Sequence, residues 1–328
     1  MTPFRSVLVT GGGGFVGGNF VRLALRDRPG WRITVFDSLG GRPRPVLAGL
    51  EEGHPDRLTL VRGKVTDGGD LDRLFGGDPF DAVVHFAARN PSGQAVEDPR
   101  GFAEVNVLGT AMLLEAARRA PAGAPGRFLH LSSYEVYGSS PDGIFTERSP
   151  LNPSTPYAAS KAAADQLTLA YHRTFGMGCL VTRTTNIYGP YQSEDKLLPS
   201  VVLNARDGLA LKVYGDGTNT RDWIHVDDHN RGVMLALERG RPGEVYHLGA
   251  RCERSNLDLV RGAARAAAAA LGRDGASVER LIAFVEDRAG HDARRSLDPS
   301  KSERELGFGP AVPFERGLEE TVRHILAV

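Results

Sequence analysis

Tyr157 and Lys161 lie four residues apart in the segment YAASK, so a helix would present both side chains on one face. A lysine ammonium beside a phenol favours the phenolate and lowers a pKa that normally lies near ~10. A tyrosine in that setting can take the proton of an alcohol while a hydride leaves the same carbon atom. Ser133, at the end of a predicted strand, can hydrogen-bond that alcohol. The three residues predict an alcohol-oxidising centre, although this tyrosine–lysine spacing also arises by chance.

A glycine-rich segment, TGGGGFVGG at 10–18, indicates where the hydride would go. Gly11, Gly14 and Gly17 recur every third residue between a predicted strand and a predicted helix. Such glycines let the backbone approach a pyrophosphate, and the helix N-terminus supplies amide donors. Asp37 ends the second predicted strand, where a carboxylate accepts from ribose hydroxyls and repels a 2′-phosphate. The pattern predicts NAD in preference to NADP; the alternative is a tight turn beside an unrelated aspartate.

The predicted cofactor site also includes residues from the loops that follow neighbouring strands. Asp67, after the third strand, is a candidate for the adenine amino group, although such a residue is more often a turn or cap. No metal site is predicted. The full predicted cofactor site comprises Gly11, Gly14, Phe15, Val16, Asp37, Val65, Asp67, Ala87, Tyr157 and Lys161.

The elements that must hold these residues alternate between apolar β-branched runs and helical periods. That order predicts an α/β fold, with a doubly wound parallel sheet of the Rossmann type. The predicted strands are Ser6–Thr10, Ile33–Asp37, Leu58–Arg62, Ala82–Phe86 and Phe128–Leu131. The predicted helices are Gly14–Arg26, Phe102–Ala120 and Tyr157–Thr174.

The second half of the chain predicts a smaller lobe over the carboxyl edge of the sheet. Strands are expected near Leu211–Tyr214 and Glu244–Leu248, and the alanine-rich run at 261–272 is expected to be an ordinary helix. We assign 1–187 to the NAD-binding domain, with returning segments near 213–250, and 188–328 mainly to substrate binding.

Composition excludes several classes of function. The 40 acidic and 40 basic residues balance, so neither nucleic acid nor an anionic membrane surface is an expected partner. The two cysteines, Cys179 and Cys252, cannot build a disulfide framework, which favours a reducing compartment. No apolar run reaches the roughly 20 residues of a membrane span, and no signal-peptide pattern opens the chain. A cytoplasmic protein is predicted.

Several motifs together resemble a known family. HFAA at 85–88, NVLGT at 106–110 and SSYEVYG at 132–138 join the glycine turn and YAASK in resembling the extended short-chain dehydrogenase/reductases. Three later segments are similar to the dTDP-glucose 4,6-dehydratases of that superfamily, and the similarity covers nearly the whole chain. These segments are NIYGPYQSEDKLLP at 186–199, VYGDGTNTRDWIHVDDH at 213–229 and DRAGHDARRSLDPSKSERELGF at 287–308.

The resemblance implies a nucleotide-diphosphate sugar, dTDP- or UDP-linked, as substrate. It assigns Arg221 and Arg288 to the diphosphate, which suits the bidentate and permanently charged guanidinium. It also assigns Asn186 to the sugar or its phosphate, and Leu198, Val213 and Tyr214 to the base. Without the resemblance, such residues would more often be surface pairs. The implied substrate site comprises Arg89, Asn186, Leu198, Val213, Tyr214, Arg221, Asn256, Arg288 and His291.

The resemblance further implies a redox-neutral elimination of water. A hydride leaves sugar C4 for NAD, a carboxylate removes the C5 proton, the C6 hydroxyl leaves as water, and the hydride returns to C6. The family pattern after the catalytic serine or threonine is Asp-Glu, acid then base, whereas this chain has Tyr134-Glu135. Tyr134 can protonate the departing hydroxyl or fill the space of the C6 group. The bland alternative puts Tyr134 in the core and Glu135 in a surface pair.

Other outcomes share the first oxidation step. A UDP-glucuronate decarboxylase needs a cation for the substrate carboxylate, and Arg183 or Arg89 could serve. A 4-epimerase has no use for a C5 base, so Glu135 argues against it. A catalytically silent NAD-binding protein is the non-enzymatic alternative. The segment ARNPSGQAV at 88–96 departs from the family, which predicts an altered sugar pocket.

Oligomeric state is the last sequence-based expectation. The predicted helices Phe102–Ala120 and Tyr157–Thr174 carry apolar residues on more than one face. In the resembling family such helices form a four-helix interface between subunits. The resemblance therefore implies a homodimer.

Overall fold

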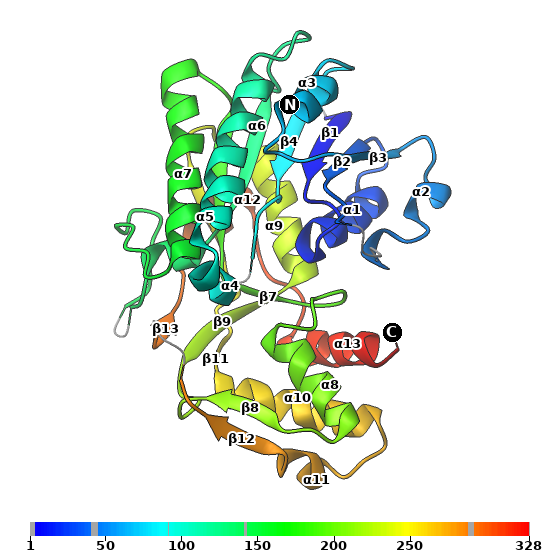
Figure 1. Ribbon diagram of the computed structural model, residues 1–328, viewed down its shortest axis with the longest axis vertical. Coiled ribbons are helices and arrows are strands. Elements are labelled where there is room, and N and C mark those ends of the chain that lie inside the picture. The colour runs from blue at the N-terminus through cyan, green and yellow to red at the C-terminus, as the bar shows by residue number, and fades with distance from the viewer. Residues whose placement is uncertain (1–3, 41–44, 91, 141–142, 288–291, 328) are drawn as a thin grey trace.

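The structure, a computed structural model, describes residues 4–40, 45–90, 92–140, 143–287 and 292–327. A seven-stranded parallel sheet forms the larger lobe, in the order β10-β6-β5-β4-β1-β2-β3 (Figure 1). Its strands are β1 (Ser6–Thr10), β2 (Arg32–Asp37), β3 (Leu58–Arg62), β4 (Ala82–His85), β5 (Arg127–Ser133), β6 (Cys179–Thr184) and β10 (Val245–Leu248). The predicted α/β Rossmann-type fold is confirmed.

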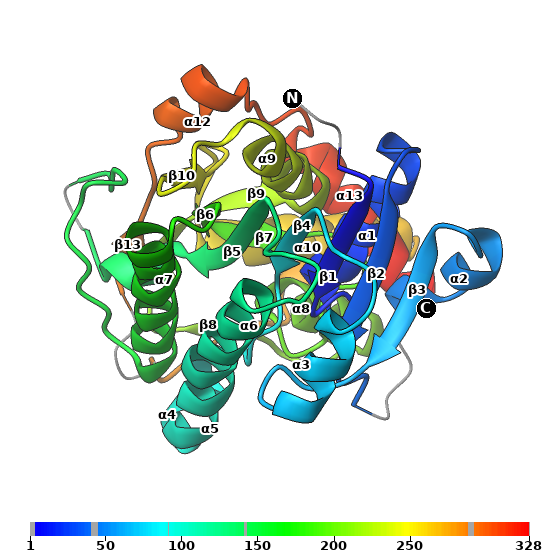
Figure 2. The same cartoon turned by 90° about the horizontal axis from the view of Figure 1, so that it is seen from above.

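Both faces of this sheet are buried, because successive strand residues point to opposite sides. Val7 and Val9 enter one core, whereas Leu8 enters the other, and all three are fully buried. Helices α1 (Phe15–Asp27), α9 (Val226–Arg239) and α12 (Ser300–Leu306) cover the first face, and α3 (Gly68–Phe75), α6 (Gly109–Arg118) and α7 (Pro156–Phe175) cover the second (Figure 2).

The predicted helix Phe102–Ala120 is helical almost to its end, but it is not a uniform α-helix. The chain instead forms α5 (Pro99–Ala103), a π-helical turn η2 (Glu104–Leu108) and then α6. Within the π turn the Asn106 carboxamide accepts from the Arg89 backbone N–H at 2.7 Å and donates to Ser160 Oγ at 2.9 Å. These contacts tie the turn to the loop after β4 and to α7, so tertiary bonding offsets the poorer local hydrogen bonds.

The smaller lobe lies below the carboxyl ends of the large sheet in Figure 1. Strand β9 (Thr220–His225) pairs with β7 (Asn186–Tyr188), β11 (Glu253–Ser255) and β13 (Arg294–Arg295), and β8 (Leu211–Tyr214) pairs with β12 (Ile282–Val285). Helices α8 (Leu197–Asp207), α10 (Asn256–Ala270), α11 (Gly275–Glu279) and α13 (Phe314–Ala327) pack here. The alanine-rich helix prediction is confirmed by α10, whose Ala263, Ala264 and Ala267 are buried.

The chain crosses between the lobes more than once. After β7 and β9 it returns through α9 and β10 to the large sheet, and α12 packs on α9. The predicted division at residues 187 and 188 falls inside β7, and that division stays a prediction. No helix of the described residues is long and apolar enough to cross a membrane.

Candidate active site

The glycine turn between β1 and α1 is packed too closely for any side chain at its first position. Gly11 has φ of +72° and its N–H donates to Phe36 O at 2.9 Å. A Cβ on Gly11 would stand 2.5 Å from Ala87 N, and one on Gly17 would stand 2.4 Å from Gly11 O. Only glycine satisfies both conditions, because other residues strain at this φ and clash. The turn therefore presents bare backbone at the N-terminus of α1.

Asp37 closes the turn from the neighbouring strand. Its Oδ2 accepts from Gly13 N at 2.9 Å, and its Oδ1 accepts from Leu39 N at 2.8 Å. The carboxylate is thus fixed beside the glycine backbone at the carboxyl end of β2. A bare backbone cradle, a helix N-terminus and a fixed carboxylate fit a dinucleotide with free ribose hydroxyls.

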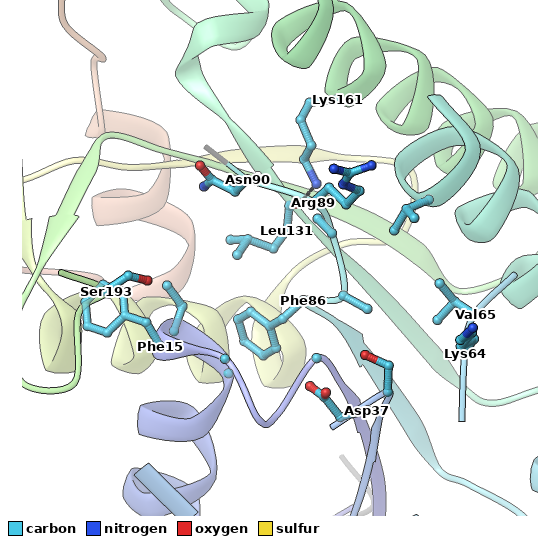
Figure 3. A pocket seen from close by; sticks show the side chains of 18 of the residues that line it. Phe15, Asp37, Lys64, Val65, Phe86, Arg89, Asn90, Leu131, Lys161 and Ser193 are labelled. Atoms are coloured by element: carbon cyan, nitrogen blue, oxygen red, sulfur yellow. Dashed lines mark hydrogen bonds between the residues drawn. The ribbon is translucent and has the colours of Figure 1, made fainter. Parts of the chain in front are cut away.

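A cleft of about 680 Å³ runs from this turn along the carboxyl edge of the sheet. In Figure 3, Asp37 and Phe86 approach the cleft from the glycine-turn side, and Lys161 and Arg89 lie across from them. The predicted cofactor residues that line it are Gly11, Gly14, Phe15, Val16, Asp37, Val65, Ala87, Tyr157 and Lys161. Asp67 instead caps α3, where its Oδ1 accepts from Asp70 N at 2.9 Å.

Lys161 is held at the floor of the cleft by the strand beneath it. Its ammonium donates to Leu131 O at 2.5 Å and lies 3.4 Å from His130 Nε2. Burial lowers the pKa of Lys161 to about 8, and the Asp165 carboxylate opposes that shift. Burial therefore makes the charged form of Lys161 less stable than it would be in water.

Tyr157 is buried beside Ser133 and Glu135. Burial raises the pKa of the Tyr157 phenol above its ordinary value, the Glu135 charge raises it further, and a hydrogen bond with Ser133 opposes the rise. The protein's own groups therefore move this pKa in the direction opposite to the one expected from a neighbouring lysine. The same interactions bring three predicted catalytic residues, Ser133, Glu135 and Tyr157, to one spot.

Arg183 belongs to a buried ion pair under Lys161. It is 3% exposed, its Nε donates to Asp165 Oδ2 at 2.9 Å, and its Nη1 donates to Tyr137 Oη at 2.5 Å. The guanidinium is therefore committed to the core. This corrects the expectation that Arg183 could meet a substrate carboxylate.

Tyr134 lies in the core beside the catalytic spot. It is 1% exposed, and its hydroxyl donates to Asn186 Oδ1 at 3.0 Å. Burial raises the pKa of Tyr134, with Arg221 and Arg295 opposing the rise. The alternative in which Tyr134 points into the core is therefore confirmed. The side-chain oxygen of Asn186 is engaged by this hydrogen bond.

Glu135 forms an ion pair with a buried arginine that the sequence did not reveal. Arg295 Nη1 lies 3.2 Å from Glu135 Oε2, and the guanidinium stands 5.6 Å from the centre of the Tyr134 ring. Asp292 accepts from Arg295 Nε at 2.7 Å and also from Ser154 Oγ at 3.1 Å. A surface pair for Glu135 is therefore wrong, because Arg295 is only 8% exposed.

The predicted substrate residues are distributed over both lobes. Arg221 is 6% exposed and donates to the carbonyl oxygens of Thr220 and Asp292. Arg89 forms an ion pair with Asp98 at the rim of the cleft. Asn256 opens α10 and Tyr214, half-buried, ends β8. Arg288 and His291 lie outside the described residues.

Leu198 and Val213 pack into the core of the smaller lobe, and each is 1% exposed. Neither side chain is exposed enough in this structure to contact a nucleotide base. Their contact with the base stays a prediction.

Sequence reasoning missed Arg295 and Asn106. The only signal for Arg295 was the pair Arg294-Arg295, because adjacent residues of a strand point to opposite sides and one of two arginines must then turn inward. Asn106 stood in the quoted NVLGT segment, but no spacing indicated its role in the π turn.

Comparison with known proteins gives a consistent result. The family model described as GDP-mannose 4,6 dehydratase matches residues 8–321. A dTDP-glucose 4,6-dehydratase of Actinoplanes sp. is 45% identical over 322 residues, covering 96% of each chain. Another, of Streptomyces niveus, is 44% identical over 321 residues, covering 96% of this chain and 91% of the relative. The crystal structure of DesIV, a dTDP-glucose 4,6-dehydratase from Streptomyces venezuelae with NAD and TYD bound, has a TM-score of 0.89 at 45% identity, covering 98% and 97%.

Proposed function

The chain belongs to the GDP-mannose 4,6 dehydratase family of extended short-chain dehydrogenase/reductases, and we propose that it is an NAD-dependent nucleotide-sugar 4,6-dehydratase acting on dTDP-glucose. The observation that carries this proposal is that Tyr157, which lines the glycine-lined cleft together with Lys161, has Ser133 and Glu135 as neighbours. The site has one group that can deprotonate an alcohol and a separate carboxylate. This suits oxidation of the alcohol followed by proton abstraction next to the new ketone.

The cofactor fits the cleft because the Gly11 cradle leaves no room for a side chain and Asp37 is fixed beside it. Bound NAD would supply the hydride acceptor for the oxidation at C4 and the hydride donor for C6. Tyr157 takes the C4 hydroxyl proton, and Ser133 holds the oxygen in reach. Lys161 keeps a positive charge near the phenolate. Glu135 removes the C5 proton, which the C4 ketone acidifies.

The substrate-side assignment rests on the permanent charge of Arg221. Its guanidinium donates to the Thr220 and Asp292 carbonyl oxygens and stays charged in the core, and that buried positive charge suits the diphosphate of a dTDP- or UDP-linked sugar. Arg288, His291, Asn256 and Tyr214 complete the proposed substrate site, with Asn186 near the sugar.

A UDP-glucuronate decarboxylase is the second candidate, and Arg295 is the observation that favours it. This buried guanidinium adjoins Glu135, where a C6 carboxylate would need a cation. Both candidates share the oxidation step, so the product must separate them.

The deciding experiment incubates the protein with NAD and dTDP-glucose, with UDP-glucuronate in a parallel tube, followed by mass spectrometry. We expect the dTDP-sugar to lose one water, roughly 18 mass units, and to give the absorbance of a 4-keto sugar in base. Release of carbon dioxide from the glucuronate without water loss from dTDP-glucose would contradict the dehydratase proposal. NAD binding without turnover of either sugar would favour a silent cofactor-binding protein.

The proposal extends to a cytoplasmic homodimer formed through α6 and α7. Leu108, 51% exposed, lies at the entrance to α6 and gives that surface an apolar residue. Light scattering at micromolar concentration should give twice the chain mass of 35.3 kDa. A monomer there would contradict the dimer.

A further inference from the structure

The hydroxyl proton of Tyr134, its one acidic proton, is already engaged in a hydrogen bond inside the core. Its hydroxyl donates to Asn186 Oδ1 at 3.0 Å, and the residue is 1% exposed. A phenol in that position cannot turn toward a departing hydroxyl without breaking its hydrogen bond to Asn186 in a largely water-excluded setting. The residue at the acid position of the family is therefore a wall of the site.

Arg295 instead controls the carboxylate next to it. Asp292 accepts a hydrogen bond from the Arg295 guanidinium and another from Ser154. Glu135 Oε2 also pairs with this guanidinium and lies 3.2 Å from Nη1. The Tyr134 ring supports the guanidinium at 5.6 Å. A planar fork held on three sides has one orientation, and so does the carboxylate that pairs with it.

We propose that Glu135 performs both proton transfers of the elimination, with Arg295 as the residue that positions its carboxylate. The inference rests on the proposed dehydratase function. It differs from a two-residue acid–base pair in needing no second proton donor.

The proton balance of this step closes on one side chain. Glu135 takes the C5 proton, and the C5–H electron pair becomes the C5–C6 double bond. The C6–O bond breaks with its electrons on oxygen. Glu135 then gives the same proton to that oxygen, which leaves as water, and the carboxylate is restored. C6 lies outside the ring, so rotation about C5–C6 brings its hydroxyl to the face from which the C5 proton was taken.

The test uses the full chain with NAD and dTDP-glucose, following product, absorbance of the reduced cofactor at 340 nm, and deuterium uptake at C5 in heavy water. Tyr134→Phe should keep kcat within about threefold, because its hydroxyl does no chemistry. Arg295→Met should lower kcat for product formation about 10²-fold with KM little changed. Reduced cofactor should accumulate, because the oxidation step still proceeds while the elimination that follows it is slowed. Arg295→Lys should recover about tenfold of that loss by restoring the cation.

Arg294→Met is the matched control, since Arg294 lies next in the strand but pairs with Glu253 at 2.6 Å. It should leave kcat and cofactor absorbance unchanged. A loss of 10²-fold or more in Tyr134→Phe would overturn the inference, as would an Arg295→Met enzyme that still couples oxidation to water loss. Should Arg295→Met fail to fold, Tyr134→Phe and Arg295→Lys decide the matter. Failure of the proposed function is distinguishable, because the wild type would then make neither reduced cofactor nor dehydrated product.

Discussion

Burial governs the ionisable residues of the cleft more strongly than their spacing does. It lowers the pKa of Lys161 to about 8 and raises that of Tyr157, although the sequence suggested mainly a mutual effect. The buried Asp165–Arg183 pair stands under both residues and places opposite charges in the core. The pKa values of single residues in this cleft therefore depend on their surroundings more than on their type.

Lys161 gives the first prediction, which concerns stability against pH. Its folded pKa of about 8 lies below the ordinary lysine value of 10.5, so between these pH values the unfolded chain binds more protons than the folded one. The free energy of unfolding should therefore rise from pH 8 towards 10.5 in wild type relative to Lys161→Met. Urea unfolding at several pH values measures this. Lys212→Met, at an exposed position on β8, should instead run parallel to wild type.

Gly11 gives a prediction about the cradle. Gly11→Ala should lower the free energy of unfolding by about 1–3 kcal/mol, because the new Cβ meets Ala87 N and the φ is positive. It should also weaken NAD binding by at least about tenfold in calorimetric titration. Gly30→Ala is the control, since a Cβ there has nothing within 4 Å. Equal effects of both substitutions would show that crowding at the cradle is unimportant.

At the scale of elements, the π turn η2 connects α5, α6, α7 and the loop after β4. Asn106→Leu removes the partner of the partly buried Arg89 N–H and of the buried Ser160 Oγ. We expect a loss of about 1–3 kcal/mol in the free energy of unfolding, measured in urea. Asn204→Leu, which removes one exposed bond to Ala210 O, should cost less than about 1 kcal/mol. A smaller effect at Asn106 than at Asn204 would contradict this account of the turn.

Central strands such as β1 and β4 were predictable from sequence because their residues are buried on both faces, which gives continuous apolar runs. Ser6–Thr10 and Leu58–Arg62 were predicted to the residue, and β8 lies where a strand was expected near Leu211–Tyr214. In β3 and β8 some residues are exposed, so there the strand-forming Thr, Val and Tyr side chains carried the signal. The π turn within the helix at 102–120 was not predictable, because it depends on where Arg89 and Ser160 lie in space.

The site divides in the same way. Motif residues such as Gly11 and Tyr157 carry fixed spacings, whereas Arg295 acts through β13, a strand of two residues whose pairing with β9 no local pattern announces. The Glu135–Arg295 contact joins residues from distant segments of the chain, so it followed from the fold alone.

At the scale of the whole molecule, the returning chain makes the lobes depend on each other. A fragment of 1–187 would lack β10, which pairs with β6, and α9, which buries Val233 and Leu237 against the sheet. We expect this fragment to be unfolded or aggregated, and the full chain to unfold in one urea transition. Circular dichroism and limited proteolysis measure both. A folded fragment would mean that the large sheet is complete without its seventh strand.

Tyr134 and Arg295 also constrain how this protein can evolve. The Arg295 guanidinium lies 5.6 Å from the centre of the Tyr134 ring, and a second buried cation, Arg221, is near the same tyrosine. A change to a small acidic side chain at 134 would empty the space of the ring and draw Arg295 away from Glu135. Substitutions at the two positions are therefore epistatic: each is tolerated or harmful according to the residue at the other. In lineages that keep this site, the tyrosine and the arginine should be inherited as a pair.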